Sequence, residues 1–296
     1  MNREEIEKNS RQVFGSHHAA EQANEDIFQR KLQYYTQDPY EYLEIPRGWF
    51  EGKKALDAGS GTALPTTQIL LEAGATVTSL DLPGEYPFDD SRIRDRFKGK
   101  YNLMRGNVLE LPFEDHSFDY VHCQGVLHHT VDAKKGFKEL TRVCKPGGHV
   151  YITVFGTSGL FREVEDFFRA KYKKDEKFKS WVDNLTGEEL KGYIRWTNQN
   201  MEENFPPIPE DLLDEDMAVT IKDRMQAPLY ERYSQEEVFS WFTENGLNPK
   251  RVSRYAHGYK NLRRYFCPQY KNYNHPIAKL FNGEGLIQVI GKKNCS

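Results

Sequence analysis

The sequence has no long hydrophobic run and no cysteine pattern typical of a metal site or a disulfide framework. No apolar segment approaches the roughly 20 residues that a membrane-spanning helix needs, and M-N-R-E-E-I-E-K-N at the N-terminus lacks a signal-peptide core. The cysteines, Cys123, Cys144, Cys267 and Cys295, show neither a Cys-x-x-Cys pair nor zinc-ligand spacing. We therefore expect reduced thiols, no metal site, no membrane span and a cytoplasmic protein.

The chain also has no large excess of positive or negative charge. The chain has 41 Lys and Arg against 44 Asp and Glu, a net charge of −3, so no general attraction to nucleic acid or membranes is expected. Its 296 residues can form one large domain, or one core domain with an appendage. The high aromatic content, 13%, suggests apolar or stacking pockets beyond a single core.

The strongest local pattern lies in Lys53–Thr62, which reads K-K-A-L-D-A-G-S-G-T. A short apolar run ends in Asp57, and the turn Gly59–Ser60–Gly61 follows at once. Helix-compatible residues and a second β-rich run come next, and that run ends in Asp81. Strand, glycine turn, helix, strand and acid form half of a doubly wound nucleotide-type fold, in which the acid suits ribose hydroxyls.

The turn differs from the sequence patterns of known phosphate-binding loops, and these differences indicate which kind of ligand it binds. Leu64 stands where a dinucleotide fingerprint needs Gly or Ala, and Pro65 removes one helix N-terminal N–H. Asp57 would repel a phosphate and attract an ammonium group. A ligand with adenine, ribose and a cationic amino-acid tail fits these features, which favours S-adenosylmethionine (SAM). A lone Gly-x-Gly is equally consistent with a plain tight turn.

Two later blocks carry a resemblance to a known family. They read G-N-V-L-E-L-P-F-E-D-H-S-F-D-Y-V-H-C-Q-G-V-L-H-H-T and K-E-L-T-R-V-C-K-P-G-G-H-V-Y-I-T-V-F. With the Asp57 loop, they resemble the class I SAM-dependent methyltransferases of the type 11 group, from about Lys53 to Phe155. The resemblance implies an α/β fold with a doubly wound, mostly parallel seven-stranded sheet (Rossmann-like). For its reversed last strand the candidate is Gly285–Gly291, preceded by Arg251–Tyr255.

The resemblance also implies a cofactor site for SAM, with S-adenosylhomocysteine as product. The implied cofactor-binding residues are Asp57, Gly59, Ser60, Gly61, Asp81, Leu82, Asn107, Val108 and Gln124. The Asp57 loop would lie under the methionine part, and Asp81 would bind the ribose. Asn107 stands where the family usually has Asp, at the adenine amino group, and Val108 would offer its backbone N–H. Gln124 would face the reactive methyl.

His128 and His129 follow the fourth strand and allow two interpretations. One of them could deprotonate an attacking hydroxyl or amine. Alternatively, the pair packs and hydrogen-bonds the loop after that strand. We favour packing, because methyl transfer from a sulfonium is downhill and positioning can supply most of the acceleration.

The predicted organisation has four parts. Residues 1–50 form a helical arm, 51–156 the SAM-binding core, 157–233 an inserted helical cap, and 234–296 complete the core sheet. The arm, with an aromatic cluster that includes tyrosines 34, 35, 40 and 42, either caps the ligand or packs on the sheet. The cap opens with an aromatic run from Phe161 to Tyr172. We favour the interpretation that the cap is a lid over the substrate side; the alternative is a solvated helical insertion without ligand contact.

Residues 245–283 contain no Asp or Glu and interleave basic with aromatic side chains. Such a stretch is most often a solvated amphipathic surface; it also suits an anionic small substrate or, less favoured, RNA. The leading hypothesis is SAM-dependent methyl transfer, by in-line SN2 displacement, to a small-molecule acceptor that is anionic or aromatic. The alternatives are an RNA or protein methyltransferase that uses residues 245–283, and a non-catalytic SAM-binding protein.

Overall fold

A computed structural model of the chain describes residues 3–22, 25, 29, 45–62, 64–82, 90–202, 205–213, 215–252 and 274–295. The chain divides into two compact units. The core unit is Met1–Thr157, Pro228–His257 and Glu284–Ser296, and the second unit is Ser158–Ala227 and Gly258–Gly283. The tyrosines at 34, 35, 40 and 42 and most of the basic aromatic segment, 253–273, lie outside the described residues.

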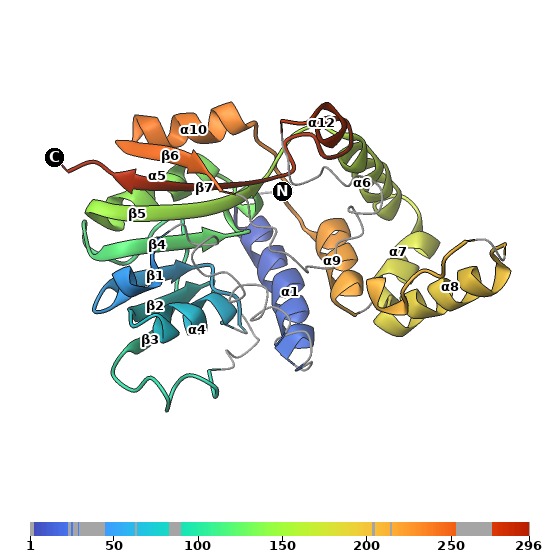
Figure 1. Cartoon of the computed structure of the whole chain (residues 1–296), viewed down its shortest axis with the longest axis horizontal. Helices are drawn as coiled ribbons and strands as arrows, with labels where there is room; N and C mark the ends of the chain where they lie inside the picture. Colours follow the sequence, from blue (N-terminus) through green and yellow to red (C-terminus); the bar gives the residue numbers. More distant parts are fainter. Residues whose placement is uncertain are drawn as a thin grey trace. The chain divides into compact units, whose positions relative to one another are not determined.

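The core unit contains a seven-stranded sheet with the order β3-β2-β1-β4-β5-β7-β6 (Figure 1). Its strands are β1 (Lys54–Ala58), β2 (Thr76–Asp81), β3 (Tyr101–Arg105), β4 (Phe118–Gln124), β5 (Cys144–Phe155), β6 (Leu247–Arg251) and β7 (Leu286–Lys293). The first five strands pair in parallel, whereas β7 is antiparallel to both β5 and β6. This confirms the predicted mostly parallel sheet with a reversed strand at Gly285–Gly291. The preceding strand, β6, ends at Arg251 instead of beginning there.

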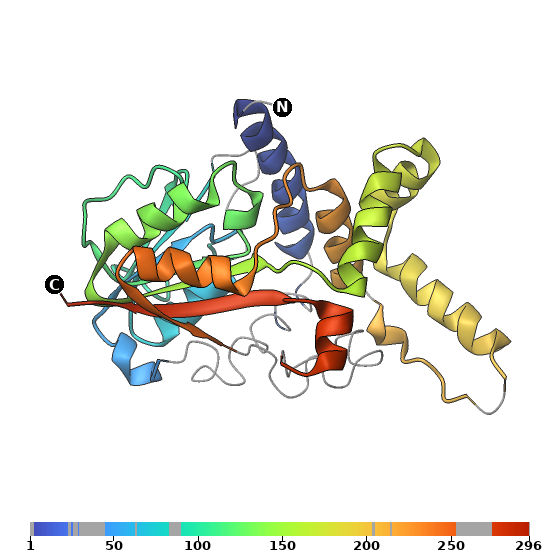
Figure 2. The same ribbon diagram turned by 90° about the horizontal axis from the view of Figure 1, so that it is seen from above.

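Helices cover both faces of the sheet. In the core unit they are α1 (Arg3–Gln22), η1 (Arg47–Phe50), α4 (Pro65–Glu72), η2 (Leu127–His129), α5 (Ala133–Val143) and α10 (Gln235–Glu244). Successive strand residues point to opposite faces, so Ala55 packs with Phe50 and α4, while Leu56 packs with α5 and α10. The last two helices lie side by side (Figure 2). The ring centroids of Phe137 and Phe242, one from each helix, are 4.6 Å apart.

The tract Lys145–Gly148 begins a strand, although its sequence predicts a stop between helix and strand. Helix α5 does end at Val143, but β5 starts at the next residue and its register with β4 is irregular there. Gly147 has a φ of +76°, and a Cβ on Gly148 would come 2.7 Å from the Asp119 carbonyl oxygen. The glycines therefore let β5 pass close to β4 from its first residues.

The second unit is helical over its described part, with α6 (Leu160–Tyr172), α7 (Glu176–Asn184), α8 (Gly187–Asn200), η3 (Glu210–Leu212), α9 (Glu215–Gln226) and α12 (Pro276–Asn282). Helix α6 buries its polar face: Arg162 pairs with Glu165 at 2.7 Å, and Arg224 of α9 binds the same carboxylate at 2.9 Å. Phe167 on its aromatic side is 66% exposed. Among the described residues, no helix has the length and apolar character to cross a membrane.

Candidate active site

The glycine turn after β1 is held on two sides. The Gly59 N–H donates to the Leu80 carbonyl at 2.7 Å, and the Gly61 N–H donates to Asp81 Oδ2 at 2.6 Å. Both glycines have positive φ, +77° and +64°. A Cβ on Gly59 would come 2.2 Å from Cγ2 of Val126, in the loop after β4. Glycine at this position is therefore required by the approach of a neighbouring loop of the protein.

Asp81 ends β2 and organises the loops on either side of it. Besides the Gly61 N–H, its carboxylate accepts the Leu82 N–H, through Oδ1, at 2.7 Å. A carboxylate oxygen has two lone pairs, so an acid at this position suits ribose hydroxyls. Ser60, between the two glycines, is buried, and its Oγ donates to the Gly61 carbonyl at 3.1 Å.

Asp57, at the end of β1, lies inside the protein with an exposure of 2%. Its Oδ2 accepts the Thr67 hydroxyl at 2.7 Å, and Thr67 Oγ1 lies 2.6 Å from Ser79 Oγ. Burial raises the pKa of Asp57 to about 7, and the charge of Asp81 adds to the rise. A cation placed near this carboxyl would favour its ionised form.

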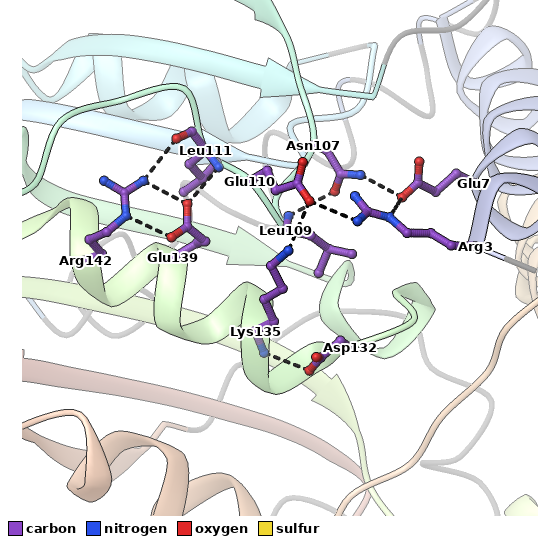
Figure 3. Close-up of polar contacts among 10 residues, drawn as sticks. All are labelled: Arg3, Glu7, Asn107, Leu109, Glu110, Leu111, Asp132, Lys135, Glu139 and Arg142. Atoms are coloured by element: carbon purple, nitrogen blue, oxygen red, sulfur yellow. Dashed lines mark hydrogen bonds and ion pairs between the residues drawn. The ribbon is translucent and has the colours of Figure 1, made fainter.

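Asn107 follows β3, and both ends of its amide are engaged (Figure 3). Its Nδ2 donates to Oε1 of Glu7, on α1, at 2.8 Å, and its Oδ1 accepts the Leu109 N–H at 2.9 Å. The next residue, Val108, is buried, and its backbone N–H has no hydrogen-bond acceptor among the described residues. A donor of this kind suits a ring nitrogen of adenine.

A chain of polar side chains runs along β4 toward Gln124. The Tyr120 hydroxyl lies 3.1 Å from His122 Nδ1, and His122 Nε2 lies 3.2 Å from Gln124 Oε1. His122 is fully buried and stacks on Tyr151 with ring centroids 4.7 Å apart. The sequence reasoning assigned His122 no role, although the alternation of side chains along a strand puts positions 120, 122 and 124 on one face.

The two histidines of η2 have different surroundings. His128 is 1% exposed and its ring packs 4.0 Å from that of Phe155. His129 is partly exposed, and its Nδ1 lies 2.7 Å from the Leu229 carbonyl oxygen. Since a carbonyl only accepts, Nδ1 carries the proton in neutral His129 and Nε2 carries the lone pair.

These residues fit an adenosyl ligand with a charged amino-acid tail. The glycine turn follows β1, Asp81 ends β2 and Asn107 follows β3; these strands are neighbours in the sheet, so all three features lie at one carboxyl edge. Ligands of doubly wound sheets bind at this edge, where the strand order reverses, here between β1 and β4. The Thr62 hydroxyl, at the end of the turn, is buried without a hydrogen-bond partner among the described residues, which is expected of a group that meets a ligand.

The sheet order, the reversed β7 and this carboxyl edge define a class I methyltransferase fold. Residues 56–152 match the family described as "Methyltransferase domain". This segment, about a third of the chain, is therefore a methyltransferase domain.

Several relatives resemble part of the chain. The demethylmenaquinone methyltransferase of Bacillus subtilis (strain 168) is 32% identical over 145 residues, which cover 45% of this chain and 62% of that protein. Phosphoethanolamine N-methyltransferase 2 of Caenorhabditis elegans is 30% identical over 172 residues, 53% of this chain and 36% of that one. The matches to these relatives thus cover less than two thirds of their length.

A solved structure from Galdieria sulphuraria, assigned as a sarcosine dimethylglycine methyltransferase, shares the fold with a TM-score of 0.50. It is 16% identical, and the match covers 87% of this chain and 85% of that chain.

Proposed function

We propose that this protein transfers a methyl group from SAM to a small-molecule acceptor. The observation that carries the proposal is the order of groups along the carboxyl edge: the glycine turn, Asp81 and Asn107–Val108 lie at the ends of three neighbouring strands. An extended ligand crossing this edge meets a site for an ammonium group, then one for ribose, then one for a base.

SAM would supply an electrophilic methyl group, which an acceptor would take by in-line SN2 displacement. The residues of this chain have separate tasks. Asp57 stabilises the cationic tail from below the turn, and Asp81 accepts the ribose hydroxyls. The Val108 N–H donates to the adenine ring, which leaves the methyl end near Gln124, at the end of β4.

Within this proposal, Gln124 and His129 lie on the acceptor side. Because His122 holds the Gln124 oxygen at 3.2 Å, the Gln124 amide has a defined orientation. If the acceptor loses a proton, His129 is the histidine suited to receive it, since its neutral tautomer carries the lone pair on Nε2. The buried position of His128 favours a packing role.

A small-molecule acceptor is supported by the partial relatives, which are named for methylation of demethylmenaquinone and phosphoethanolamine. The alternative, an RNA or protein acceptor, depends on residues 245–283, of which 253–273 lie outside the described residues. Nothing observed in the described part of the chain favours that alternative.

Calorimetry with S-adenosylhomocysteine tests the cofactor. We expect wild-type protein to bind it, Gly59→Arg and Asp81→Ala to abolish binding, and Glu163→Ala, an exposed acidic position in the second unit, to bind normally. Circular dichroism establishes that each variant is folded. Failure of the folded wild-type protein to bind any adenosyl ligand would remove the proposal.

Transfer of label from methyl-labelled SAM tests the acceptor class. A panel of quinols, amines and carboxylic acids is compared with total RNA and with unfolded polypeptide. Label in a small molecule supports the proposal; label only in RNA or polypeptide favours the alternative. Binding without transfer to any of them favours a non-catalytic SAM-binding protein.

A further inference from the structure

Helix α1 crosses the carboxyl edge at which the adenosyl ligand is proposed to bind. Near its start, Glu7 contacts Asn107, after β3. Further along, the Phe14 ring lies 4.7 Å from the ring of His129, after β4. Seven residues of helix span about 10 Å, and the three strand spacings from β3 to β4 span about 14 Å. One helical segment therefore reaches over the edge from the adenine side to the acceptor side.

The face of α1 that carries these contacts is built to meet a polar group. Ser10 lies between Glu7 and Phe14 at helical spacing, so the three share one side of the helix. The Ser10 hydroxyl is buried, with an exposure of 4%, and has no hydrogen-bond partner among the described residues. Buried hydroxyls are normally bonded, so this one points to a ligand.

Glu7 brings a negative charge to the loop after β3 (Figure 3). Its Oε1 accepts Arg3 Nε at 2.7 Å as well as the Asn107 amide at 2.8 Å. Arg3 also binds Glu110, in the same loop, at 2.9 Å, and Lys135 binds Glu110 at 3.0 Å. Glu7 Oε2 accepts no hydrogen bond from the described residues.

Asn107 offers an adenine amino group only one remaining acceptor position, the second lone pair of Oδ1. Its Nδ2 is a donor group directed at Glu7, and its Oδ1 already accepts the Leu109 N–H. The adjacent carboxylate is a stronger acceptor than an amide oxygen, because hydrogen bonds to ionised groups are shorter and stronger.

We propose that Glu7 selects adenine by accepting a hydrogen bond from its exocyclic amino group. This inference rests on the proposed function, since it assumes that SAM binds at this edge. The base would lie between Glu7 and the Val108 N–H, which supply an acceptor and a donor. An amino group donates to Glu7, whereas a carbonyl oxygen at the same ring position would face a carboxylate and be rejected.

The test compares, by calorimetry, the affinities of S-adenosylhomocysteine and its purine riboside analogue, in which hydrogen replaces the exocyclic amino group and the ring nitrogens remain acceptors. We expect wild-type protein to prefer the adenosyl compound by about tenfold to a hundredfold, the size expected for a hydrogen bond to a charged group. Glu7→Gln keeps the length of the side chain and an acceptor for Asn107, yet offers a donor as well. It should reduce the preference to within about threefold by the same reasoning.

Glu110→Gln is the matched control, since it removes a carboxylate that binds the same Arg3 and leaves the two side-chain hydrogen bonds of Asn107 in place. It should keep the wild-type preference. If Glu7→Gln also keeps it, or if the wild-type protein has no preference, Glu7 does not read the base, although the proposed function stands. If the wild-type protein binds neither compound, the proposed function itself fails.

Discussion

The packing of Gly59 against Val126 makes a sharp prediction, because the chain offers a matched control. Gly59 and Gly125 have similar positive φ values, +77° and +73°. A Cβ on Gly59 would come 2.2 Å from Val126 Cγ2, whereas a Cβ on Gly125 would meet nothing within 4 Å. Alanine at either position carries the same backbone strain, but only alanine at 59 also collides with a side chain.

The backbone strain and the side-chain collision contribute separate amounts to the loss of stability. Placing alanine in the left-handed region costs about 1–2 kcal/mol, which both variants should lose from the free energy of unfolding. Overpacking adds about 1–3 kcal/mol for Gly59→Ala alone. Val126→Ala removes both γ carbons and leaves Cβ at 3.2 Å, so the double variant Gly59→Ala/Val126→Ala should recover most of the overpacking cost.

Urea unfolding without ligand measures the backbone and overpacking costs. The proteins compared are the wild type, Gly59→Ala, Gly125→Ala, Val126→Ala and the double variant. We expect a favourable coupling energy between positions 59 and 126 of about 1–3 kcal/mol. If Gly59→Ala costs no more than Gly125→Ala, or if Val126→Ala gives no recovery, the collision does not determine the residue at 59.

Other predictions concern buried or partly buried polar groups. Burial raises the pKa of Asp57 from 3.8 to about 7, so its contribution to stability is full below pH 3.8 and is lost as pH rises to about 7. Asp57→Asn should remove this fall in urea titrations across that range; an unchanged profile contradicts it. Arg142→Lys should cost about 1–3 kcal/mol, because Arg142 donates to the Leu111 and Phe113 carbonyls at 3.0 and 2.7 Å; an unchanged urea midpoint contradicts it. Thr62→Val should stabilise the ligand-free protein by about 1 kcal/mol and weaken S-adenosylhomocysteine binding in calorimetry; unaltered affinity would place the hydroxyl away from the ligand.

The sequence predicts the sheet well because its strands are marked locally. A glycine follows β1 and β4, at positions 59 and 125, and an acid, Asp81, ends β2, so the sequence marks the carboxyl edge as well as the strands. The site residues that follow these strands could therefore be named in advance. Their partners could not, since the contact between Glu7 and Asn107 joins positions 100 residues apart.

Helix α6 shows a second feature that the sequence does not predict, namely which side of a helix is buried. Its aromatic periodicity predicts an amphipathic helix, and a helix is present, but the pattern does not say which side is buried. Arg162, Glu165 and Arg169 are the buried residues, because Arg224 of α9 binds Glu165 with its side chain and Arg169 with its carbonyl. Buried charges are stable only with such partners, and the partners come from a separate stretch of the chain.

The asparagine at 107 and the carboxylate at 7 are best understood as one feature. Arg3 and Lys135 supply two positive charges to the loop after β3, and Glu7 and Glu110 supply two negative charges. An aspartate at 107, as the family usually has, would place a third negative charge in hydrogen-bond contact with Glu7. Two like charges at about 4 Å repel by about 4 kcal/mol at an effective dielectric constant of about 20, more than the amide hydrogen bond contributes. With the acid on α1, position 107 must be neutral, and the departure from the family motif follows from the N-terminal helix.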